Sequence, residues 1–445
     1  MDNKTIYALS TVFGKSGVGV IRISGKDAFT VIDKMTNLDV KKITSHHSKL
    51  ATIFDSRTHQ ELDKALVLCF CGPHSFTGED TVEINCHGSK AVIRSIIDSL
   101  SAIEGFRLAE PGEFSRRSFY NGKMDLTAAD GLADLIEAET SLQQQVALKQ
   151  MGGNLLNLYD KWREQLLEIL AYIEAYIDFP DEDIPQNTVF KIENNVFKVK
   201  EAILQHLSVN KVEERLRDGF NVVISGPTNA GKSSLINALV RRNVAIVSDI
   251  AGTTRDAIDA YIDINGFPII LTDTAGLREA DDAIERIGIQ LAKEKINTAD
   301  FKVFIFDAAV DRPEIFAQYL NGNNYILVAN KADKLSNEQK NKLKNAGCVL
   351  ISAKNNENVS EISSKIYDYF NEMYLESSSQ LITRQRYRES LSECVDCLAQ
   401  FNLNKNIELA AEDIRLACRA IGKITGRVAV DEILDKIFSS FCIGK

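Results

Sequence analysis

Long apolar runs are missing from this chain of 445 residues, and its beginning carries no signal-peptide pattern. No segment approaches the length of a membrane-spanning helix, so the expected location is the cytoplasm. The eight cysteines are scattered and form no disulfide framework, which is typical of a reducing compartment. Positive charge is also in deficit: the formal net charge is −10, so the chain is not expected to coat nucleic acid through bulk charge.

Signals for a metal or redox centre are few. Cys394 and Cys397 have the spacing of a redox or metal pair, but no second pair or neighbouring histidine accompanies them, and one face of a helix is the favoured interpretation. His74 and His87 lie in turns rich in glycine and polar residues, where structural or solvated histidines are more common than catalytic ones. No cluster of cysteine and histidine indicates zinc.

The most informative stretch is 221–238. An apolar, β-branched run ends at Gly226, and four residues later Gly231-Lys232-Ser233 opens a segment with helical spacing, which is the strand, loop and helix order of a P-loop. The glycines allow the backbone to fold around phosphate oxygens and to present amide donors. Lys232 is expected to reach the β and γ phosphates, and Ser233 to hold Mg²⁺. The predicted nucleotide contacts here are Asn229, Ala230, Gly231, Lys232, Ser233 and Ser234.

A second apolar strand is expected at 268–273. It ends in Asp273, which is predicted to hold Mg²⁺ through water, and Gly276 is free to approach the γ phosphate. Thr274 and Ala275 between them are also expected to contact the nucleotide.

The base-binding motifs follow further along the chain. Asn330, Lys331 and Asp333 come after an apolar run at 325–329, and Asp333 can accept paired hydrogen bonds from the guanine amino group and ring nitrogen, which adenine lacks. Ser352, Ala353 and Lys354 follow another apolar run and complete the predicted guanine pocket. The four motifs occur in the order of the Ras-like GTPases, which this stretch resembles. The sequence therefore predicts an enzyme that hydrolyses GTP.

The chain divides by composition into about three domains. We expect a mixed α/β domain at 1–118 with strands at 5–9, 17–23, 64–70 and 81–86, a helical segment at 119–218, a GTPase module at 219–371, and a return to helices at 372–445. Thr127 and Asp130 predict an N-terminal capping box, and helices are expected at 155–177 and 189–216. The simplest arrangement is a GTPase module inserted into a helical domain. The alternative is consecutive domains whose last helices pack on the module.

Five motifs carry a resemblance over the whole length: residues 111–115 with 121–126, the turn 177–184, the loop 249–256 and the terminal 441–445. With these, the chain resembles the MnmE (TrmE) family of tRNA modification GTPases. The resemblance implies an N-terminal α/β folate-binding and dimerisation domain, a discontinuous helical domain, and an inserted Ras-like P-loop G domain. It also implies a homodimer.

The resemblance further implies a reaction. With MnmG, an FAD protein, the family adds an aminomethyl or carboxymethylaminomethyl group to C5 of wobble uridine 34 of certain tRNAs, in a heterotetramer or larger complex. FAD would belong to the partner, and the one-carbon unit would come from 5-formyl- or methylene-tetrahydrofolate. By resemblance, Arg22, Glu83, Lys123 and Lys445 form the folate pocket, since a pterin edge suits a carboxylate and a polyglutamate tail suits cations.

In this family K⁺ neutralises transition-state charge when two G domains meet. The matching ligands are Asn229, Ser248, Ile250 and Thr253, and Thr254 would join Ser233 on Mg²⁺; Ser248 and Thr253 are also expected to contact GTP together with Thr254.

The attacking water needs an orienting group, yet Arg278 stands where Ras-type proteins have glutamine. The family resemblance implies Glu285 for this role. Without the resemblance, the sequence around Glu285 favours a solvated helix carboxylate beside Arg286. Arg255 and Arg278 remain alternatives as arginine fingers.

Two other functions stay open. An Era-like switch in ribosome or RNA assembly would carry a basic RNA-binding module after the G domain, and the arginines at 384–388 are too few to form one. Alternatively, the N-terminal region serves only for dimerisation and all carbon transfer belongs to the partner.

Overall fold

The computed structural model describes residues 4–178, 186–208, 212–245, 259–273, 293–376, 384–403, 406–428, 431–439, 441 and 443–444. The chain forms two compact units. Unit 1 comprises Met1–Ala133, Met151–Val196 and Asp396–Lys445, and unit 2 comprises Asp134–Gln150 and Phe197–Val395. None of the helices in the described ranges combines the length and apolarity needed to cross a bilayer.

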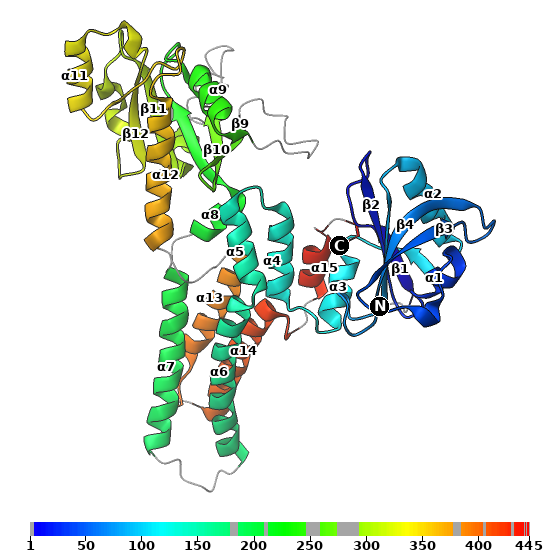
Figure 1. The fold of residues 1–445 in the computed structure, drawn as a ribbon. Helices are drawn as coiled ribbons and strands as arrows, with labels where there is room; N and C mark the ends of the chain where they lie inside the picture. Colours follow the sequence, from blue (N-terminus) through cyan, green and yellow to red (C-terminus); the bar gives the residue numbers. More distant parts are fainter. Residues whose placement is uncertain are drawn as a thin grey trace, which may run out of the picture. The chain divides into compact units, whose positions relative to one another are not determined.

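Unit 1 contains a six-stranded sheet in the order β3-β4-β5-β2-β1-β6, in which β1 and β6 alone are parallel (Figure 1). Helices α1 and α2 pack on it, and the apolar residues of α2 recur at helical spacing at Ile93, Ile96 and Leu100, so that one face is buried. The elements are β1 Thr5–Leu9, β2 Val18–Ser24, α1 Thr30–Met35, β3 Ser48–Phe54, β4 Glu61–Phe70, β5 Thr81–His87, α2 Lys90–Ser101 and β6 Phe106–Leu108.

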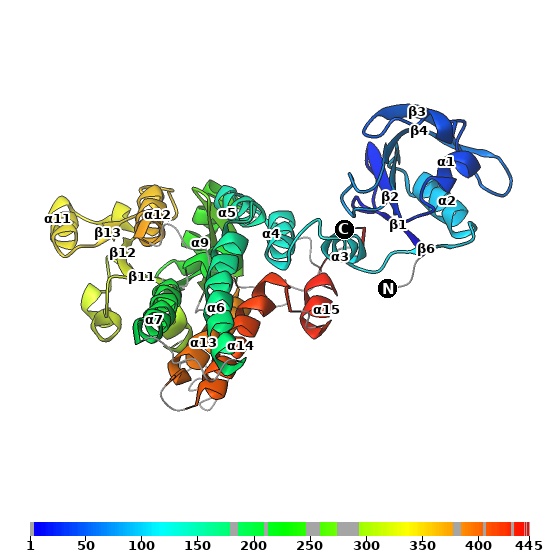
Figure 2. The same ribbon diagram turned by 90° about the horizontal axis from the view of Figure 1, so that it is seen from below.

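The helices of unit 1 come from both ends of the chain. The long α6 lies side by side with α14 (Figures 1 and 2), and Arg415 of α14 pairs with Glu174 of α6 at 3.0 Å. The chain therefore returns after the G domain to complete a discontinuous helical domain. The elements concerned are α3 Glu113–Tyr120, α4 Leu126–Glu137, α6 Asn154–Asp178, α14 Ile407–Thr425 and α15 Asp431–Ser439.

Unit 2 is built on a seven-stranded sheet in the order β13-β12-β11-β7-β10-β9-β8. The strands from β13 to β10 run parallel, while β9 and β8 continue antiparallel at one edge. The elements are α5 Ser141–Met151, α8 Val212–Asp218, β7 Phe220–Ser225, α9 Lys232–Arg242, β8 Val244–Ala245, β9 Asp259–Ile264, β10 Phe267–Asp273, β11 Phe301–Asp307, β12 Tyr325–Asn330, α11 Asn337–Asn345, β13 Val349–Leu350 and α12 Val359–Glu376. This is the inserted P-loop fold expected from the motifs. Two further helices, α7 Gln186–Ser208 and α13 Gln385–Gln400, are divided between the two units.

Three local predictions differ from the structure. The helix predicted at 189–216 is two helices, α7 and α8, because Val212 and Leu216 of α8 are anchored in the core of the G sheet. The predicted capping box of Thr127 is wrong: Asp125 instead accepts the Thr127 and Ala128 amides at 2.8 and 3.2 Å. Strand β3 was not predicted, since it lies at the sheet edge and buries few apolar side chains.

Candidate functional site

The phosphate loop follows β7 and is shaped by two close approaches. A Cβ atom at Gly226 would lie 1.9 Å from the carbonyl oxygen of Ile305 on β11, and one at Gly231 would lie 2.1 Å from Nδ2 of Asn330. Asn229 and Gly231 also have left-handed backbones, with φ of 62° and 99°. Only glycine satisfies both the space and the conformation at position 231, which explains the motif spacing.

Lys232 and Ser233 open α9 at the end of this loop. The Lys232 ammonium is buried beneath the loop and donates to the carbonyl oxygens of Gly226 and Pro227 at 2.5 and 2.7 Å. Ser233 and Ser234 are exposed in the first turn of α9. The cation and a hydroxyl therefore meet at a helix N-terminus, where backbone amides also favour anions.

Asn330 joins the phosphate loop to the base-binding loops. Its Nδ2 donates to the carbonyl oxygen of Ala230 at 2.8 Å, and its Oδ1 accepts the amides of Lys331 and Ala353 at 2.8 and 3.0 Å. The side chain is almost fully buried. One amide thus positions three of the predicted nucleotide loops.

The base-binding loops carry the charges that the guanine prediction needs. The pKa of Asp333 is lowered from its ordinary value, chiefly by the adjacent Ser352 hydroxyl and further by the Lys334 and Lys354 cations, so this carboxyl is ionised. Lys331 has a left-handed backbone and its ammonium pairs with Asp307 at 2.6 Å. Burial acts to raise the pKa of Asp307, but the Lys331 ammonium lowers it on balance.

Asp307 was missed from the sequence, although it ends the apolar strand β11 in the same way that Asp273 ends β10. Because β7, β10, β11 and β12 are parallel, their carboxyl ends meet at one edge of the sheet. Ligands bind at this edge in open α/β sheets. The predicted contacts within the described residues all end these strands, follow them or lie beside them: Asn229–Ser234, Asp273, Asn330, Lys331, Asp333 and Ser352–Lys354.

The remaining predicted residues of the nucleotide site fall outside the described ranges. These are Ser248, Ile250, Thr253, Thr254, Thr274, Ala275, Gly276 and Glu285. Their roles stay predictions.

The predicted folate residues lie in unit 1. Arg22 on β2 faces Glu83 on β5, and their side chains pair at 2.8 Å with each about one-fifth exposed. The Arg22 guanidinium lies over the rings of Phe76 and Phe114, at 5.4 and 5.8 Å from their centroids. Such a charged pair between aromatic faces suits a flat, polar ring system.

Lys123 lies beside the loop that carries Phe76. A Cβ atom at Gly78 would be 3.2 Å from Cγ of Lys123, and Asn121 donates to the Thr77 carbonyl oxygen at 2.7 Å. Lys445 lies outside the described residues, but its neighbour Gly444 accepts a hydrogen bond from the Ser10 hydroxyl at 2.9 Å. The described end of the tail is therefore held against the strand β1.

A buried ion network supports this region and was missed from the sequence. Arg117 is about 4% exposed and binds Glu79 at 3.1 Å and Glu113 at 3.0 Å. Burial acts to raise the pKa of Glu113, yet hydrogen bonds led by that from Arg107 lower it below the ordinary value. Glu113 and Arg117 stand four residues apart on α3, a spacing that the sequence shows, but Glu79 lies 38 positions before Arg117 and no local pattern connects it to them.

Comparisons with known proteins cover the whole chain. The family model described as the MnmE helical domain matches residues 126–442, and the one described as the GTP-binding protein TrmE N-terminus matches residues 5–123. The tRNA modification GTPase MnmE of Rickettsia rickettsii is 44% identical over 450 residues, covering 99% of this chain and 100% of that protein. The protein of the same name from Wolbachia sp. subsp. Brugia malayi is 43% identical over 446 residues, covering 100% and 99%.

Solved structures match a smaller part. Era of Aquifex aeolicus, bound to GDP·AlF4⁻, is 28% identical over 40% of this chain and 66% of that chain, with a TM-score of 0.28.

Proposed function

Because this chain belongs to the MnmE family of tRNA modification GTPases, we propose that its GTP hydrolysis drives the addition of an aminomethyl or carboxymethylaminomethyl group to C5 of wobble uridine 34 in certain tRNAs. The partner in this reaction is MnmG, which brings FAD, and the one-carbon unit comes from 5-formyl- or methylene-tetrahydrofolate. The protein works as a homodimer within a heterotetramer or larger complex, in the cytoplasm.

The observation that carries the nucleotide part of this proposal is the arrangement around Asn330. This side chain holds the phosphate loop, the Lys331 backbone and the Ala353 backbone together. Lys232 at one end of the arrangement supplies a cation for the phosphates, and Asp333 at the other supplies a carboxylate for the base. A single ligand that has phosphates at one end and guanine at the other satisfies both ends.

Mg²⁺ would be held by Ser233 together with Thr254, and by Asp273 through water. The Ser233 hydroxyl is exposed at the start of α9, and Asp273 ends a neighbouring parallel strand, so the described donors are hard oxygens of the kind that Mg²⁺ takes. When bound, Mg²⁺ would neutralise negative charge on the phosphate oxygens.

K⁺ would be held by Asn229, Ser248, Ile250 and Thr253 where two G domains meet. Asn229 is exposed in the phosphate loop, so a second copy of the chain could approach it. When bound, K⁺ supplies positive charge in place of an arginine finger. Glu285 orients the attacking water.

In the folate pocket, the Glu83 carboxylate accepts hydrogen bonds from the pterin edge, and Arg22 holds that carboxylate in place from between Phe76 and Phe114. Lys123 and Lys445 attract the negative tail of the folate. The anchoring of Gly444 at Ser10 supports a tail residue that reaches this region.

The guanine assignment is tested by Asp333→Asn. An asparagine amide offers an acceptor on one atom and a donor on the other, so it keeps at most one of the two hydrogen bonds to guanine and sets its NH₂ group against the guanine amino group. It suits xanthine, which carries an oxygen where guanine has its amino group. The loss of one charge-assisted hydrogen bond, at about 1.5–3 kcal/mol, predicts a loss of GTP affinity of about 10- to 10²-fold.

Titration of the full chain with GTP and XTP measures this, with Asp368→Asn on the exposed side of α12 as the matched loss of one carboxylate. A variant at Asp333 that keeps its preference for GTP would refute the guanine site.

A further inference from the structure

Gln143, in the first turn of α5, uses its whole side-chain amide. The Oε1 atom accepts the backbone amides of Glu139 and Thr140, both at 3.0 Å, while the Thr140 hydroxyl accepts the backbone N–H of Gln143 at 3.4 Å. The Nε2 atom donates to the carbonyl oxygen of Arg217 at 3.0 Å and to the Tyr261 hydroxyl at 3.3 Å. An amide has two acceptor sites and two donors, so none is left over.

Only the acceptor side of this amide is needed to begin the helix. Thr140 and Gln143 form a capping box, in which glutamate serves as well as glutamine. The two donated bonds do nothing for α5 itself; they reach α8 and β9. The amide nitrogen therefore has a separate role, which is to tie α5 to the G sheet.

Both acceptors lie on segments that lead to the phosphate end of the nucleotide site. Arg217 is near the end of α8, directly before β7 and the phosphate loop. Tyr261 on β9 pairs with Ile270 on β10, the strand that ends at Asp273. Burial raises the pKa of Tyr261, so its hydroxyl is a neutral acceptor at physiological pH. A shift of β7 relative to β9 and β10 would strain one of the two hydrogen bonds that Gln143 Nε2 donates.

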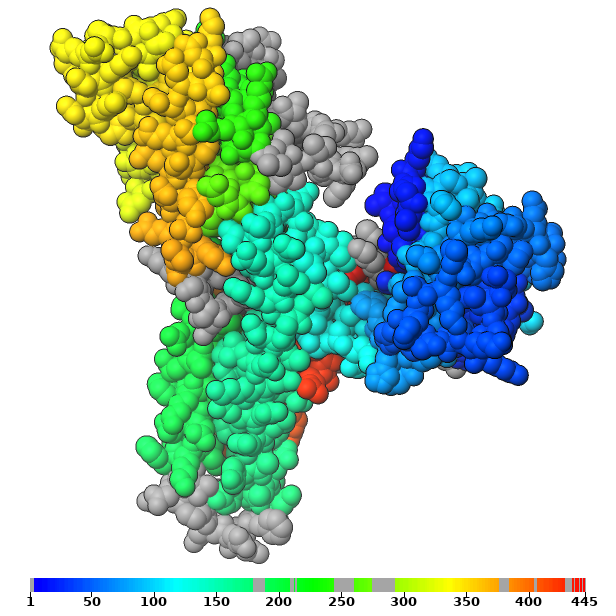
Figure 3. Space-filling model, in the orientation of Figure 1, coloured from blue at the N-terminus to red at the C-terminus, as the bar shows by residue number. Residues whose placement is uncertain are grey.

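The surroundings of Gln143 combine close contact with a void. Val146 packs in the same core as Leu216, and a Cβ atom at Gly266, in the turn between β9 and β10, would lie 2.9 Å from Oγ of Ser141. In the space-filling view the turquoise residues around α5 adjoin green residues of unit 2 (Figure 3).

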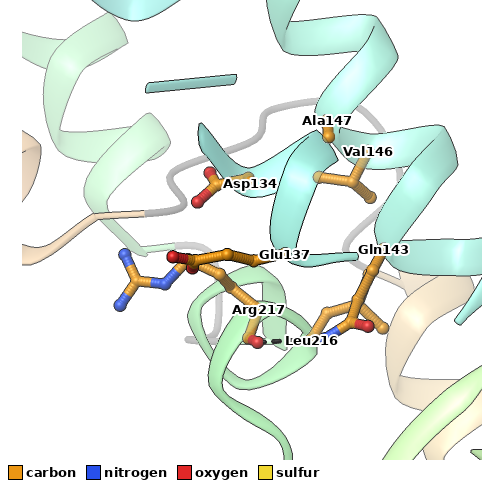
Figure 4. A pocket seen from close by; sticks show the side chains of 7 residues that line it. All are labelled: Asp134, Glu137, Gln143, Val146, Ala147, Leu216 and Arg217. Atoms are coloured by element: carbon orange, nitrogen blue, oxygen red, sulfur yellow. Dashed lines mark hydrogen bonds between the residues drawn. The ribbon is translucent and has the colours of Figure 1, made fainter. Parts of the chain in front are cut away.

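A cavity of about 40 Å³ lies beside the Gln143 bonds, lined on one side by Asp134 and Glu137 of α4 and on the other by Leu216 and Arg217 of α8 (Figure 4). This is room for a few water molecules. The void leaves one side of this joint unfilled, while Val146 and Leu216 keep α5 and α8 packed together on the other side.

The other end of α5 is joined to α13. The Gln150 amide donates to the Tyr387 hydroxyl at 3.3 Å in a buried contact. Before α5, Asp134 pairs at 2.6 Å with Arg384, next to the start of α13. The segment 134–150 is thus bonded at both ends to α13 or to the residue before it, and through Gln143 it is bonded to α8 and β9.

We propose that Gln143 is a positioning residue that transmits the state of the nucleotide site to α5, and through Gln150 to α13. The proposal rests on the proposed function, because it assumes that this chain binds GTP and GDP. The bound nucleotide changes the positions of β7 and β10. The two hydrogen bonds donated by Gln143 Nε2 then either persist, so that α5 moves with the strands, or break. Coupling of this kind requires contacts that differ between the two states.

Three variants separate the two hydrogen bonds donated by Gln143 Nε2 from the capping of α5. Gln143→Glu keeps the shape and the acceptor for the capping box but has no donor, and it sets a carboxylate against the Arg217 carbonyl. Tyr261→Phe removes one acceptor and leaves α5 intact. Thr140→Ala weakens the cap without touching either donated bond, and it is the control for a general loss of helix stability.

The measurement is amide hydrogen exchange in α5 and α13 of the full chain, with GDP and with a non-hydrolysable GTP analogue, alongside nucleotide affinity. In the wild type we expect exchange rates that differ between the nucleotides by about 5- to 150-fold. In Gln143→Glu and Tyr261→Phe, the exchange rates with the two nucleotides should differ by less than about twofold, while nucleotide affinities stay close to wild type. Thr140→Ala should retain the wild-type difference in exchange rates.

A wild-type difference that persists in Tyr261→Phe and Gln143→Glu would overturn the proposal, as would a wild type that binds both nucleotides without any difference in α5 or α13. If Gln143→Glu does not fold, Tyr261→Phe decides alone. A wild type that binds neither nucleotide would refute the proposed function instead.

Discussion

Removal of the Asn330 side chain should loosen the nucleotide site as a whole. In Asn330→Ala, the carbonyl oxygen of Ala230 and the amides of Lys331 and Ala353 lose their partner, whose side chain is only about 3% exposed in the native protein. A buried polar group left without a hydrogen bond costs about 1–3 kcal/mol. Water can enter the space of the missing amide, so the lower end of this range, about 1 kcal/mol, applies to each of the three groups. The total cost is then about 3 kcal/mol.

This free energy should appear in nucleotide binding. The loops of the variant are no longer held in place before GDP arrives, and ordering them on binding would lower the affinity by about 100-fold. Calorimetric titration with GDP and Mg²⁺ measures the loss, and denaturant unfolding shows whether the module remains folded.

Asn341→Ala, on the exposed surface of α11, is the matched control and should bind GDP as the wild type does. If Asn330→Ala bound GDP within about threefold of wild type, the loops would be fixed by something other than this amide, and the argument from its hydrogen bonds would fail.

Further variants test separate parts of the structure. Glu83→Gln should weaken tetrahydrofolate binding by about tenfold in a fluorescence titration, since a charge-assisted hydrogen bond is lost, and unchanged affinity would remove Glu83 from the pocket. Gly226→Ala places a methyl group 1.9 Å from a carbonyl oxygen of β11, and denaturant unfolding should show a loss of about 2 kcal/mol or more. The pKa of Glu113 lies below its ordinary value of 4.5, so its stabilising effect is complete above that pH and disappears as the pH falls through the native value. In thermal melts, the melting temperature of Glu113→Gln should therefore fall less steeply with decreasing pH than that of the wild type. An equally steep fall in both proteins would refute the stabilising role of the Glu113 carboxylate. Replacing K⁺ by Na⁺ should slow GTP hydrolysis, and equal rates would count against the K⁺ ligands.

The sequence could predict the strand, loop and helix order around Gly226 and Lys232 because the motif lies in consecutive residues. Gly226, Gly231 and Lys232 lie within one loop, and an apolar run before them is enough to place the strand. The same holds for Asp333, which follows β12 directly. Local chemistry and local geometry coincide at these positions.

What the sequence could not predict depends on partners that are distant along the chain. Asn330 bonds with Ala230, 100 positions away, and Gln143 bonds with Tyr261, 118 positions away. The register that sets Arg22 opposite Glu83 crosses 61 positions, so only the family resemblance pointed to that pair. The Asp125 cap shows that even local choices can fail, because two residues with suitable side chains compete for the same helix start.

The central claim is that GTP chemistry in this chain serves the modification of a tRNA base. Mass spectrometry of uridine 34 from cells that lack the gene tests it most directly, with wild type and Asn330→Ala returned on a plasmid. The account predicts that the aminomethyl and carboxymethylaminomethyl forms disappear without the gene, return with the wild type, and remain largely absent with Asn330→Ala. Unchanged levels of these modified uridines in cells without the gene would contradict it.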